Sequence, residues 1–162
     1  MQPFVGVISD THGIMRPEAL DALKGCDFII HAGDVGDPQI LDQLEAIAPV
    51  HAVRGNVDYG ALGERLPDDA LVTWRGKHLY VYHILDNLPL DPAAAGFHAV
   101  IYGHSHKPDI AHKDGVLFFN PGSAGPRRFD LPLSVGRLTV ENDQLKADLI
   151  MLNGEGRVKD EG

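Results

Sequence analysis

The chain has 162 residues, of which 44% are hydrophobic and 23% charged, and its formal net charge is −9 at pH 7. This length suits one domain with a single buried core, and the composition is that of a folded chain, which excludes wholesale disorder. The acidic balance argues against extended binding to DNA or RNA, which basic patches normally drive. It does not argue against a small phosphate-bearing substrate, because bound metal ions would reverse the local charge.

The chain has a single cysteine, Cys26, which excludes an internal disulfide and a thiolate metal site. The N-terminus lacks the features of a signal peptide, and no segment approaches the roughly 18 apolar residues of a membrane span. We therefore expect a cytoplasmic protein with no membrane partner. The sequence does not define an oligomeric state, so a homo-oligomer stays open.

Apolar runs alternate with helical segments in the first half of the chain. We predict strands at Phe4–Ser9, Phe28–His31 and Val50–Val53, and helices at Pro17–Lys24 and Asp37–Ala48. Asp37-Pro38 is typical of a helix start, because aspartate caps free backbone N–H groups and proline fits the first turn. A βαβαβ order of this kind indicates parallel strands.

The second half is richer in strands. We predict them at Leu71–Trp74, His78–His83, His98–Tyr102, Ile110–His112, Val116–Asn120, Leu133–Val140 and Leu145–Leu152, with a short helix at Pro92–Gly96. Turn residues separate three of these pairs, which indicates antiparallel hairpins. Two packed mixed sheets with helices outside satisfy the whole pattern. We expect one domain over residues 1–152 and a flexible tail over the polar, glycine-rich residues 153–162.

Polar residues with metal-binding side chains stand directly after several of the predicted strands. They are Asp10, His12, Asp34, Asn56, His83, His104 and His106. Because ligands of α/β sheets bind at the carboxyl ends of strands, these residues predict one convergent site. Asp-x-His and His-x-His would each place two donors on one face of an extended segment. Glycines at 33, 55 and 103 precede candidate ligands and would allow close approach of the backbone.

Each short motif also has a simpler interpretation. Asp10-x-His12 alone is a weak signal, Asn56 suits a turn, and Asp37 suits a helix cap. Only the joint occurrence at strand ends favours a metal site. The other histidines lack such neighbours, and we interpret them as structural or surface residues: His31, His51, His78, His98 and His112. Among these histidines, His31 is the one most expected to have a role at the site, because it lies two residues before Gly33.

The combined motifs resemble the calcineurin-like metallophosphoesterase family over Phe4 to about Arg128. They are Asp10-x-His12, Gly33-Asp34-x-x-Asp37, Gly55-Asn56-x-Asp58, His83 and Gly103-His104-x-His106. Asn120-Pro121-Gly122-Ser123, followed by Pro126-Arg127, is similar to the small bacterial and archaeal phosphodiesterase branch. The resemblance implies an α/β fold, a four-layer αββα sandwich of two mixed β-sheets flanked by helices.

The same resemblance implies two divalent metal ions per chain. It assigns Asp10, His12 and His106 to one ion and Asn56, His83 and His104 to the other, with Asp34 bridging both. Imidazole and carboxylate donors without thiolate suit manganese, our first choice, and also iron, zinc, nickel or cobalt.

The implied activity is that of a phosphodiesterase, in which a metal-bridging hydroxide attacks phosphorus in line with the leaving group. Asp34, Asn56 and His104 are predicted to be catalytic as well as metal-binding. The chain leaves no room for a cap domain, and an open site favours a small phosphodiester over a monoester.

Four further residues have predicted supporting roles. Asp37 and Asp58 would orient the metal ligands. Arg54 and Arg127 would bind substrate phosphate oxygens, because a guanidinium matches that geometry. An equally good interpretation is that Arg54 and Arg127 are surface residues in contact with solvent.

Two positions depart from the family pattern. Val57 stands where many members have the histidine that protonates the leaving group, so the acid is unidentified. Ile84 follows His83 in place of the usual glycine. The alternative function is a metal-holding interaction scaffold similar to the retromer subunit of this fold, which lacks the same histidine. A nuclease is disfavoured by the net charge of −9.

Overall fold

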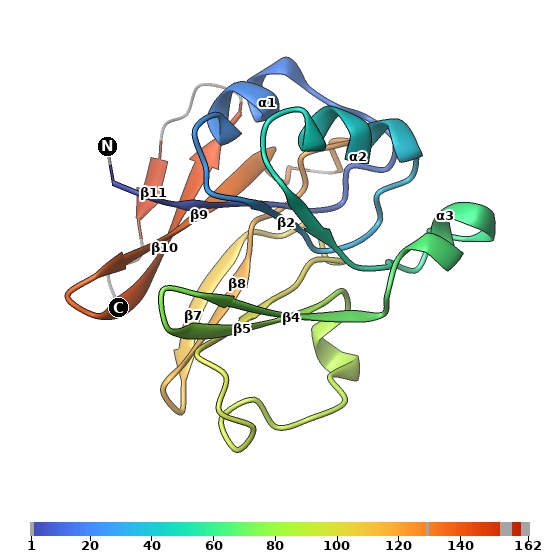
Figure 1. Ribbon diagram of the computed structural model, residues 1–162. Coiled ribbons are helices and arrows are strands. Elements are labelled where there is room, and N and C mark those ends of the chain that lie inside the picture. The colour runs from blue at the N-terminus through green and yellow to red at the C-terminus, as the bar shows by residue number, and fades with distance from the viewer. Residues whose placement is uncertain (1, 129, 153–156, 160–162) are drawn as a thin grey trace.

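The computed structural model describes residues 2–128, 130–152 and 157–159, which form two facing β-sheets (Figure 1). The strands of the first sheet, in the order β11-β10-β9-β1-β2-β3, are β1 (Val5–Ile8), β2 (Ile29–His31), β3 (Val50–Ala52), β9 (Ser134–Glu141), β10 (Gln144–Met151) and β11 (Arg157–Lys159). Those of the second, in the order β4-β5-β6-β8-β7, are β4 (Asp69–Trp74), β5 (Lys77–Tyr82), β6 (Ala99–Ile101), β7 (Asp109–Lys113) and β8 (Val116–Asn120).

Both sheets mix parallel and antiparallel pairs, as the sequence predicts. The strands β1, β2 and β3 run parallel, and so do β5, β6 and β8. The three predicted hairpins are the antiparallel pairs β4–β5, β7–β8 and β9–β10. Their register is continuous, so each predicted hairpin is confirmed.

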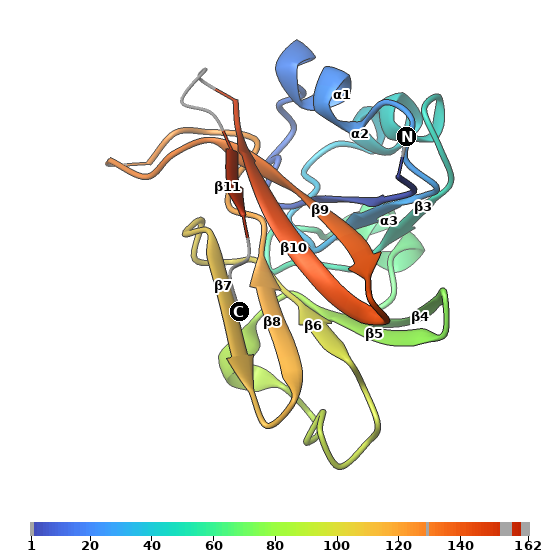
Figure 2. The ribbon, with the colours of Figure 1, turned by 90° about the vertical axis from the view of Figure 1, so that its left-hand side faces the viewer.

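Helices α1 (Pro17–Leu23) and α2 (Pro38–Glu45) connect the three parallel strands of the first sheet and cover its outer face (Figure 2). Each begins with proline in its first turn, and the Asp37 side chain accepts a hydrogen bond of 2.9 Å from the Gln39 N–H at the start of α2. This confirms the helix-cap interpretation of Asp37.

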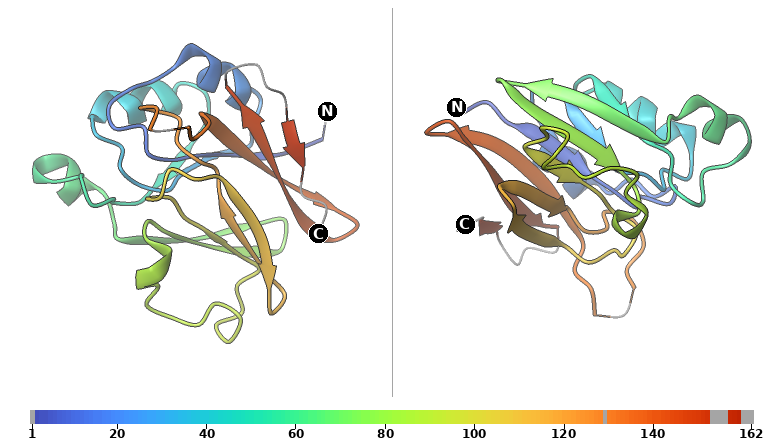
Figure 3. Two further views of the ribbon diagram at one scale, coloured as in Figure 1. Left: turned by 180° about the vertical axis from the view of Figure 1, so that it is seen from behind. Right: turned by 90° about the horizontal axis from the view of Figure 1, so that it is seen from below.

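Three apolar clusters fill the spaces between the layers. The largest lies between the two sheets and contains Val7 and Ile30 from the first sheet and Leu79, Ile101 and Phe119 from the second. Another packs α1 and α2 onto the first sheet. The smallest lies under the 3-10 turn η1 (Leu85–Asn87), on the outer face of the second sheet (Figure 3). The predicted four layers are therefore present, with the layer outside the second sheet reduced to η1 and irregular chain.

The prediction of a helix at Pro92–Gly96 is wrong. These residues form turns, in which the N–H groups of Ala95, Gly96 and Phe97 donate to the carbonyls of Asp91, Ala93 and Pro92 at 2.9, 3.2 and 3.0 Å, and Gly96 is left-handed. These bonds reach back over four, three and five residues, so they do not repeat the spacing of an α-helix, and the segment between the proline and the glycine is too short to propagate one. Conversely, the short helix α3 (Gly60–Arg65) escaped prediction, because two of its six residues are glycines of low helix propensity.

The predicted tail lies largely outside the described residues. Within it only β11 is described, and β11 pairs antiparallel with β10. No helix among the described residues is long and apolar enough to span a membrane.

Candidate metal centre

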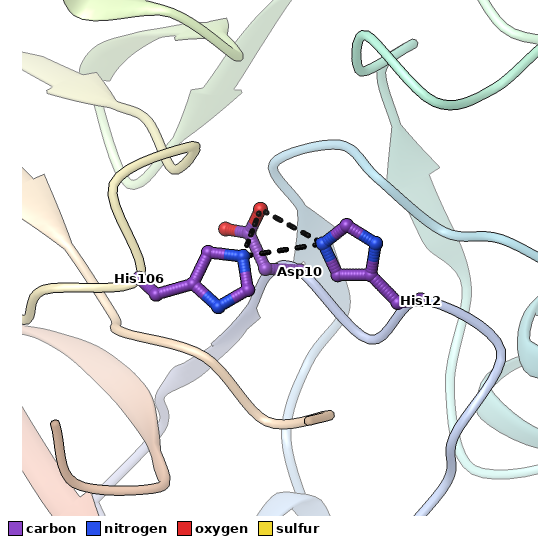
Figure 4. Close-up of side chains that lie close together, drawn as sticks. All are labelled: Asp10, His12 and His106. Carbon is purple, nitrogen blue, oxygen red and sulfur yellow. Dashed lines mark hydrogen bonds and ion pairs between the residues drawn. The ribbon is translucent and has the colours of Figure 1, made fainter. Parts of the chain in front are cut away.

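The carboxyl ends of β1 and β6 bring Asp10, His12 and His106 together (Figure 4). Asp10 Oδ1 lies 3.5 Å from His106 Nε2 and 3.8 Å from His12 Nε2, and the two imidazole nitrogens are 3.2 Å apart. Asp10 and His106 are buried and His12 is half-buried. We call these three residues the Asp10 group.

A second set, the Asp34 group, consists of Asp34, His83 and His104, which follow β2, β5 and β6. Asp34 Oδ2 lies 3.1 Å from His83 Nε2. Asn56, which follows β3, places its side-chain oxygen 3.1 Å from His83 Nε2 and 3.2 Å from His104 Nδ1. The structure therefore brings all seven candidate ligands to one edge of the sandwich, and His104 and Asn56 are exposed there.

Asp34 lies between the two groups. Its Oδ2 is 3.5 Å from His12 Nε2 of the Asp10 group as well as 3.1 Å from His83 Nε2. The Val57 N–H donates a hydrogen bond of 2.9 Å to the other carboxylate oxygen, which fixes the orientation of the side chain. This geometry suits a carboxylate that touches two ions at once.

The donor atoms fit metal ions. Bonds of about 2.0–2.2 Å place neighbouring ligand atoms of one ion roughly 3.0–3.5 Å apart, close to the separations observed here. Asp10 Oδ1 is buried and has no hydrogen-bond partner among the described residues, although three imidazole nitrogens face it at 3.5 to 3.9 Å. A buried carboxylate oxygen without a partner is costly unless a cation neutralises it.

The Asn56 amide faces Asp34 and His83. Its oxygen lies 3.1 to 3.2 Å from both Asp34 oxygens, next to His83 Nε2. The His83 Nδ1–H donates to the Ala32 carbonyl at 2.7 Å, so Nε2 can present a lone pair. In this orientation the amide oxygen could serve as a metal ligand, whereas the flipped amide would donate hydrogen bonds to Asp34 and His83.

The charges of the site act on its own titratable groups when no ion is bound. Burial favours the neutral form of Asp34, but hydrogen bonds from His83 and the Val57 N–H outweigh it and lower the pKa of Asp34 to about 2. Burial likewise acts against protonation of His83, but the Asp34 hydrogen bond and the charges of Asp10 and Asp34 raise its pKa. Burial lowers the pKa of His106. Asp34 is therefore charged throughout the neutral pH range.

The backbone at the ligands corrects one prediction. Asp-x-His and His-x-His are not extended segments, because five candidate ligands have left-handed φ angles: Asp10 (56°), His12 (47°), Asp34 (57°), His104 (73°) and His106 (63°). The donors converge because the chain turns sharply after each strand, and not because strand side chains alternate. Such conformations are sparsely populated and cluster at functional sites.

Glycines permit the close approach of these loops. A Cβ at Gly55 would overlap the Asp34 carboxylate, and one at Gly103 would overlap Ser9 and lie 2.6 Å from Asp10 Oδ2. The prediction that these glycines let the backbone approach the site without a Cβ clash is confirmed at both positions.

Asp58 links two loops that carry candidate ligands. The hydrogen bond that caps α2, by contrast, joins the Asp37 side chain to the Gln39 N–H and not to a candidate ligand. The buried Asp58 carboxylate accepts hydrogen bonds from the N–H groups of Val35, Gly36 and Gly55, at 2.9 to 3.1 Å. It thus holds the loops of Asp34 and Asn56 together, and its role in orienting the metal ligands stays a prediction.

Sequence reasoning missed the hydrogen bonds beneath Asp10. The Ser9 hydroxyl and the His104 N–H donate to Asp10 Oδ2 at 2.7 and 3.0 Å, and the Ser123 hydroxyl donates to the Asp10 carbonyl. Asn120 Nδ2 donates to the Gly103 carbonyl. The signal for the contacts of Asn120 and Ser123 is the Asn120-Pro121-Gly122-Ser123 motif, which from the sequence alone is interpreted only as a mark of a family branch.

His31 is also part of the frame of the site. Its Nδ1 accepts a hydrogen bond of 3.1 Å from the Gly33 N–H, so Nε2 carries the proton and donates to the Thr11 hydroxyl at 3.0 Å. Thr11 in turn donates to the Val35 carbonyl. The fully buried imidazole therefore ties the Asp10 loop to the Asp34 loop.

The two predicted phosphate-binding arginines differ. Arg54 lines a cavity together with Asn56 and His83, and its guanidinium forms an ion pair with Asp68. Arg127 is exposed. The neighbouring Arg128, which the sequence did not single out, lies near enough for its charge to oppose protonation of His106.

Comparison with known proteins identifies the family. The model of the calcineurin-like phosphoesterase superfamily domain matches residues 4–143. A Methanocaldococcus jannaschii protein named "Probable metallophosphoesterase" is 39% identical over 155 residues, covering 90% of this chain and 80% of that protein. A Methanothermobacter thermautotrophicus protein of the same name is 37% identical over 157 residues, covering 90% and 91%.

Two solved structures share the fold. Entamoeba histolytica Vps29 complexed with Zn²⁺ has a TM-score of 0.77 at 22% identity and covers 97% of both chains. An archaeal phosphodiesterase has a TM-score of 0.75 at 23% identity, covering 91% of this chain and 99% of that chain. Because the family model spans most of the sequence and both curated relatives are more than a third identical, the chain belongs to the calcineurin-like phosphoesterase superfamily.

Proposed function

We propose that the protein is a dinuclear metal-dependent phosphodiesterase. The observation that carries this proposal is the placement of Asp34 between two groups of nitrogen and oxygen donors, each of which can hold one ion. Seven donors are too many for one tetrahedral site, and they suit two ions that share a carboxylate.

Two bound divalent ions supply an activated water and neutralise charge on the phosphoryl oxygens. The residues of this chain fix that chemistry in space. Asp34 sets the spacing of the two groups, and Asn56 and His104 present their donors at the exposed side, where a substrate enters. These three are the residues that we propose act in catalysis.

Manganese is the first metal to test, followed by zinc, iron, nickel and cobalt. The donors are imidazole, carboxylate and amide groups, which all these ions accept. The Vps29 structure that shares this fold is described as complexed with Zn²⁺, which supports including zinc.

A diester is favoured over a monoester because the Asp34 group is open to solvent, with His104 and Asn56 exposed. The fold shared with an archaeal phosphodiesterase supports this preference. The substrate that we propose is a small phosphoester, since the net charge of −9 disfavours long nucleic acids.

Because the chain shares its fold with Vps29, a second candidate function is that of a metal-holding interaction scaffold. The decisive experiment measures hydrolysis of bis(p-nitrophenyl) phosphate by chelator-treated protein after addition of Mn²⁺. We expect turnover that His12→Ala abolishes and that His98→Ala, at the opposite end of the sandwich, leaves unchanged. Protein that binds two ions but hydrolyses no phosphoester would reject the enzyme and favour the scaffold.

A further inference from the structure

A cavity of about 170 Å³ opens beside the Asp34 group. It is lined by Asn56 and His83 together with Arg54, Asp68, Tyr82 and Ile84. We call it the Arg54 cavity. A larger cavity of about 260 Å³, lined by residues such as Lys77 and His98, includes none of the seven candidate ligands. The Arg54 cavity is therefore placed to receive part of a substrate bound at the metal centre.

Two side chains of opposite charge in the Arg54 cavity, Arg54 and Asp68, form an ion pair. Arg54 Nε and Nη2 lie 3.0 and 2.8 Å from the same oxygen of Asp68. A guanidinium has five N–H donors, so this pairing leaves donors free to face the cavity. Tyr82 and Ile84 add no formal charge. The cavity thus favours an uncharged group that carries a hydrogen-bond acceptor.

The size of the cavity suits one ring. An apolar cavity of roughly 150 Å³ holds a single benzene molecule, and the Arg54 cavity has about 170 Å³. The half-buried side chains of Tyr82 and Ile84 supply apolar surface to one such ring. A methyl group would leave most of that space to water.

We propose that the Arg54 cavity binds the retained ester group of the substrate and selects phosphodiesters whose retained group is one uncharged ring. This inference rests on the proposed phosphodiesterase function. In an in-line displacement, the leaving group departs opposite the attacking oxygen, whereas a group in this cavity is next to the ligands Asn56 and His83, which line it. The group beside the ligands is therefore the one that stays on phosphorus.

The test varies the retained group while the leaving group stays constant. The substrates are phenyl p-nitrophenyl phosphate and methyl p-nitrophenyl phosphate, and both release nitrophenolate. Because the phenyl ring removes several more carbon atoms from water, we expect kcat/KM to be roughly 10- to 100-fold higher for the phenyl ester.

Filling the cavity should abolish this preference. In Ile84→Trp the new indole occupies the space of the ring, so kcat/KM should fall more for the phenyl ester than for the methyl ester, and the ratio of the two values should approach one. The matched control Gln144→Trp places the same side chain at the larger, distant cavity and should change neither value. Elemental analysis of both variants checks that the metal content is unaltered.

Removing the compensating charge should change the selectivity. Asp68 is exposed, so Asp68→Asn should fold normally while leaving Arg54 unpaired. We expect the variant to gain about two- to fivefold on 4-carboxyphenyl p-nitrophenyl phosphate relative to the phenyl ester, an advantage that salt should weaken.

The outcomes separate the two proposals. Hydrolysis of neither diester by the metal-loaded protein would reject the phosphodiesterase function, and with it the role of the cavity. Equal hydrolysis of the phenyl and methyl esters would leave the function standing and overturn the cavity inference. So would an Ile84→Trp variant that retains its metals and loses both activities equally.

Discussion

The parallel strands β5 and β6 have histidines at both ends, and the two ends behave differently. At the carboxyl ends, His83 and His104 meet the carboxylate of Asp34. At the amino ends, the rings of His78 and His98 lie 5.5 Å apart, and His98 lines the larger cavity with Lys77. The comparison shows that the charged neighbours of a histidine indicate its function better than the number of histidines does.

The pKa values show the same contrast. Burial, followed by the charges of Lys77 and His78, lowers the pKa of His98. At the other end burial again opposes the charged form, yet the hydrogen bond to Asp34 and the carboxylate charges raise the pKa of His83. Near His83 the carboxylates outweigh burial, whereas near His98 the single carboxylate of Asp143, which lies 3.6 Å from Lys77, does not.

The largest effect is expected from Asp34→Asn. Loss of a residue that only orients a ligand typically costs 10- to 100-fold in metal affinity or activity, so loss of the shared carboxylate should reduce turnover by more than about 100-fold. Metal binding should weaken in both groups together, whereas His12→Ala should weaken mainly the Asp10 group. Isothermal titration with Mn²⁺ measures this. An Asp34→Asn variant with two ions and near wild-type turnover would exclude the bridging role.

Gly55→Ala tests how closely the loops must approach. The added Cβ would overlap the Asp34 carboxylate, so we expect metal affinity to fall by about 10- to 100-fold. The control is Gly76→Ala, in the β4–β5 hairpin at the opposite end. Gly76 has a φ of 77° and nothing within 4 Å of an added Cβ, so this variant should lose only about 1 kcal/mol of stability. Equal metal affinities in the two variants would contradict the packing argument.

His31→Gln should change how stability depends on pH. Burial lowers the pKa of His31 to about 4 in the folded protein, against an ordinary value of 6.5. The unfolded chain therefore binds more protons between these values, and stability is lost as pH falls from 6.5 to 4, by up to about 3 kcal/mol. Glutamine does not titrate, so the variant should lose less stability over this range. Urea unfolding of metal-free protein at several pH values checks the difference between the two curves.

Lys77→Gln should have the smallest effect. Because the charge of Lys77 helps to depress the pKa of His98, removing it should raise that pKa toward its ordinary value. Turnover and metal content should not change, since neither residue is a candidate ligand. NMR titration of the His98 ring measures the pKa. A loss of metal binding in this variant would break the proposed separation of the two ends.

The sequence predicted most of the strands and the residues at their ends. Apolar runs define β1, β2 and β6 directly, and polar residues that follow such runs can only lie at the sheet edge. The left-handed conformations of Asp10 and His104 were beyond such reasoning, because contacts between distant loops impose them. For the same reason the sequence did not predict the three hydrogen bonds that backbone N–H groups donate to the Asp58 carboxylate.

The helix predictions failed where local signals were weak. The low helix propensity of its two glycines kept α3 from being predicted. Pro92–Gly96 has a proline at its start and a glycine at its end, as helices often do, but it is too short to form one. The Arg54 cavity also needed the structure, since its walls come from chain segments that are distant in sequence.

The number of metal ions bound per chain decides whether the centre is dinuclear. Chelator-treated protein is dialysed against excess Mn²⁺, and bound metal is measured by elemental analysis, with ion positions located by anomalous scattering from crystals. We predict two ions per chain, one at the Asp10 group and one at the Asp34 group, with Asp34 touching both. At most one bound ion under saturating Mn²⁺ would contradict the dinuclear centre.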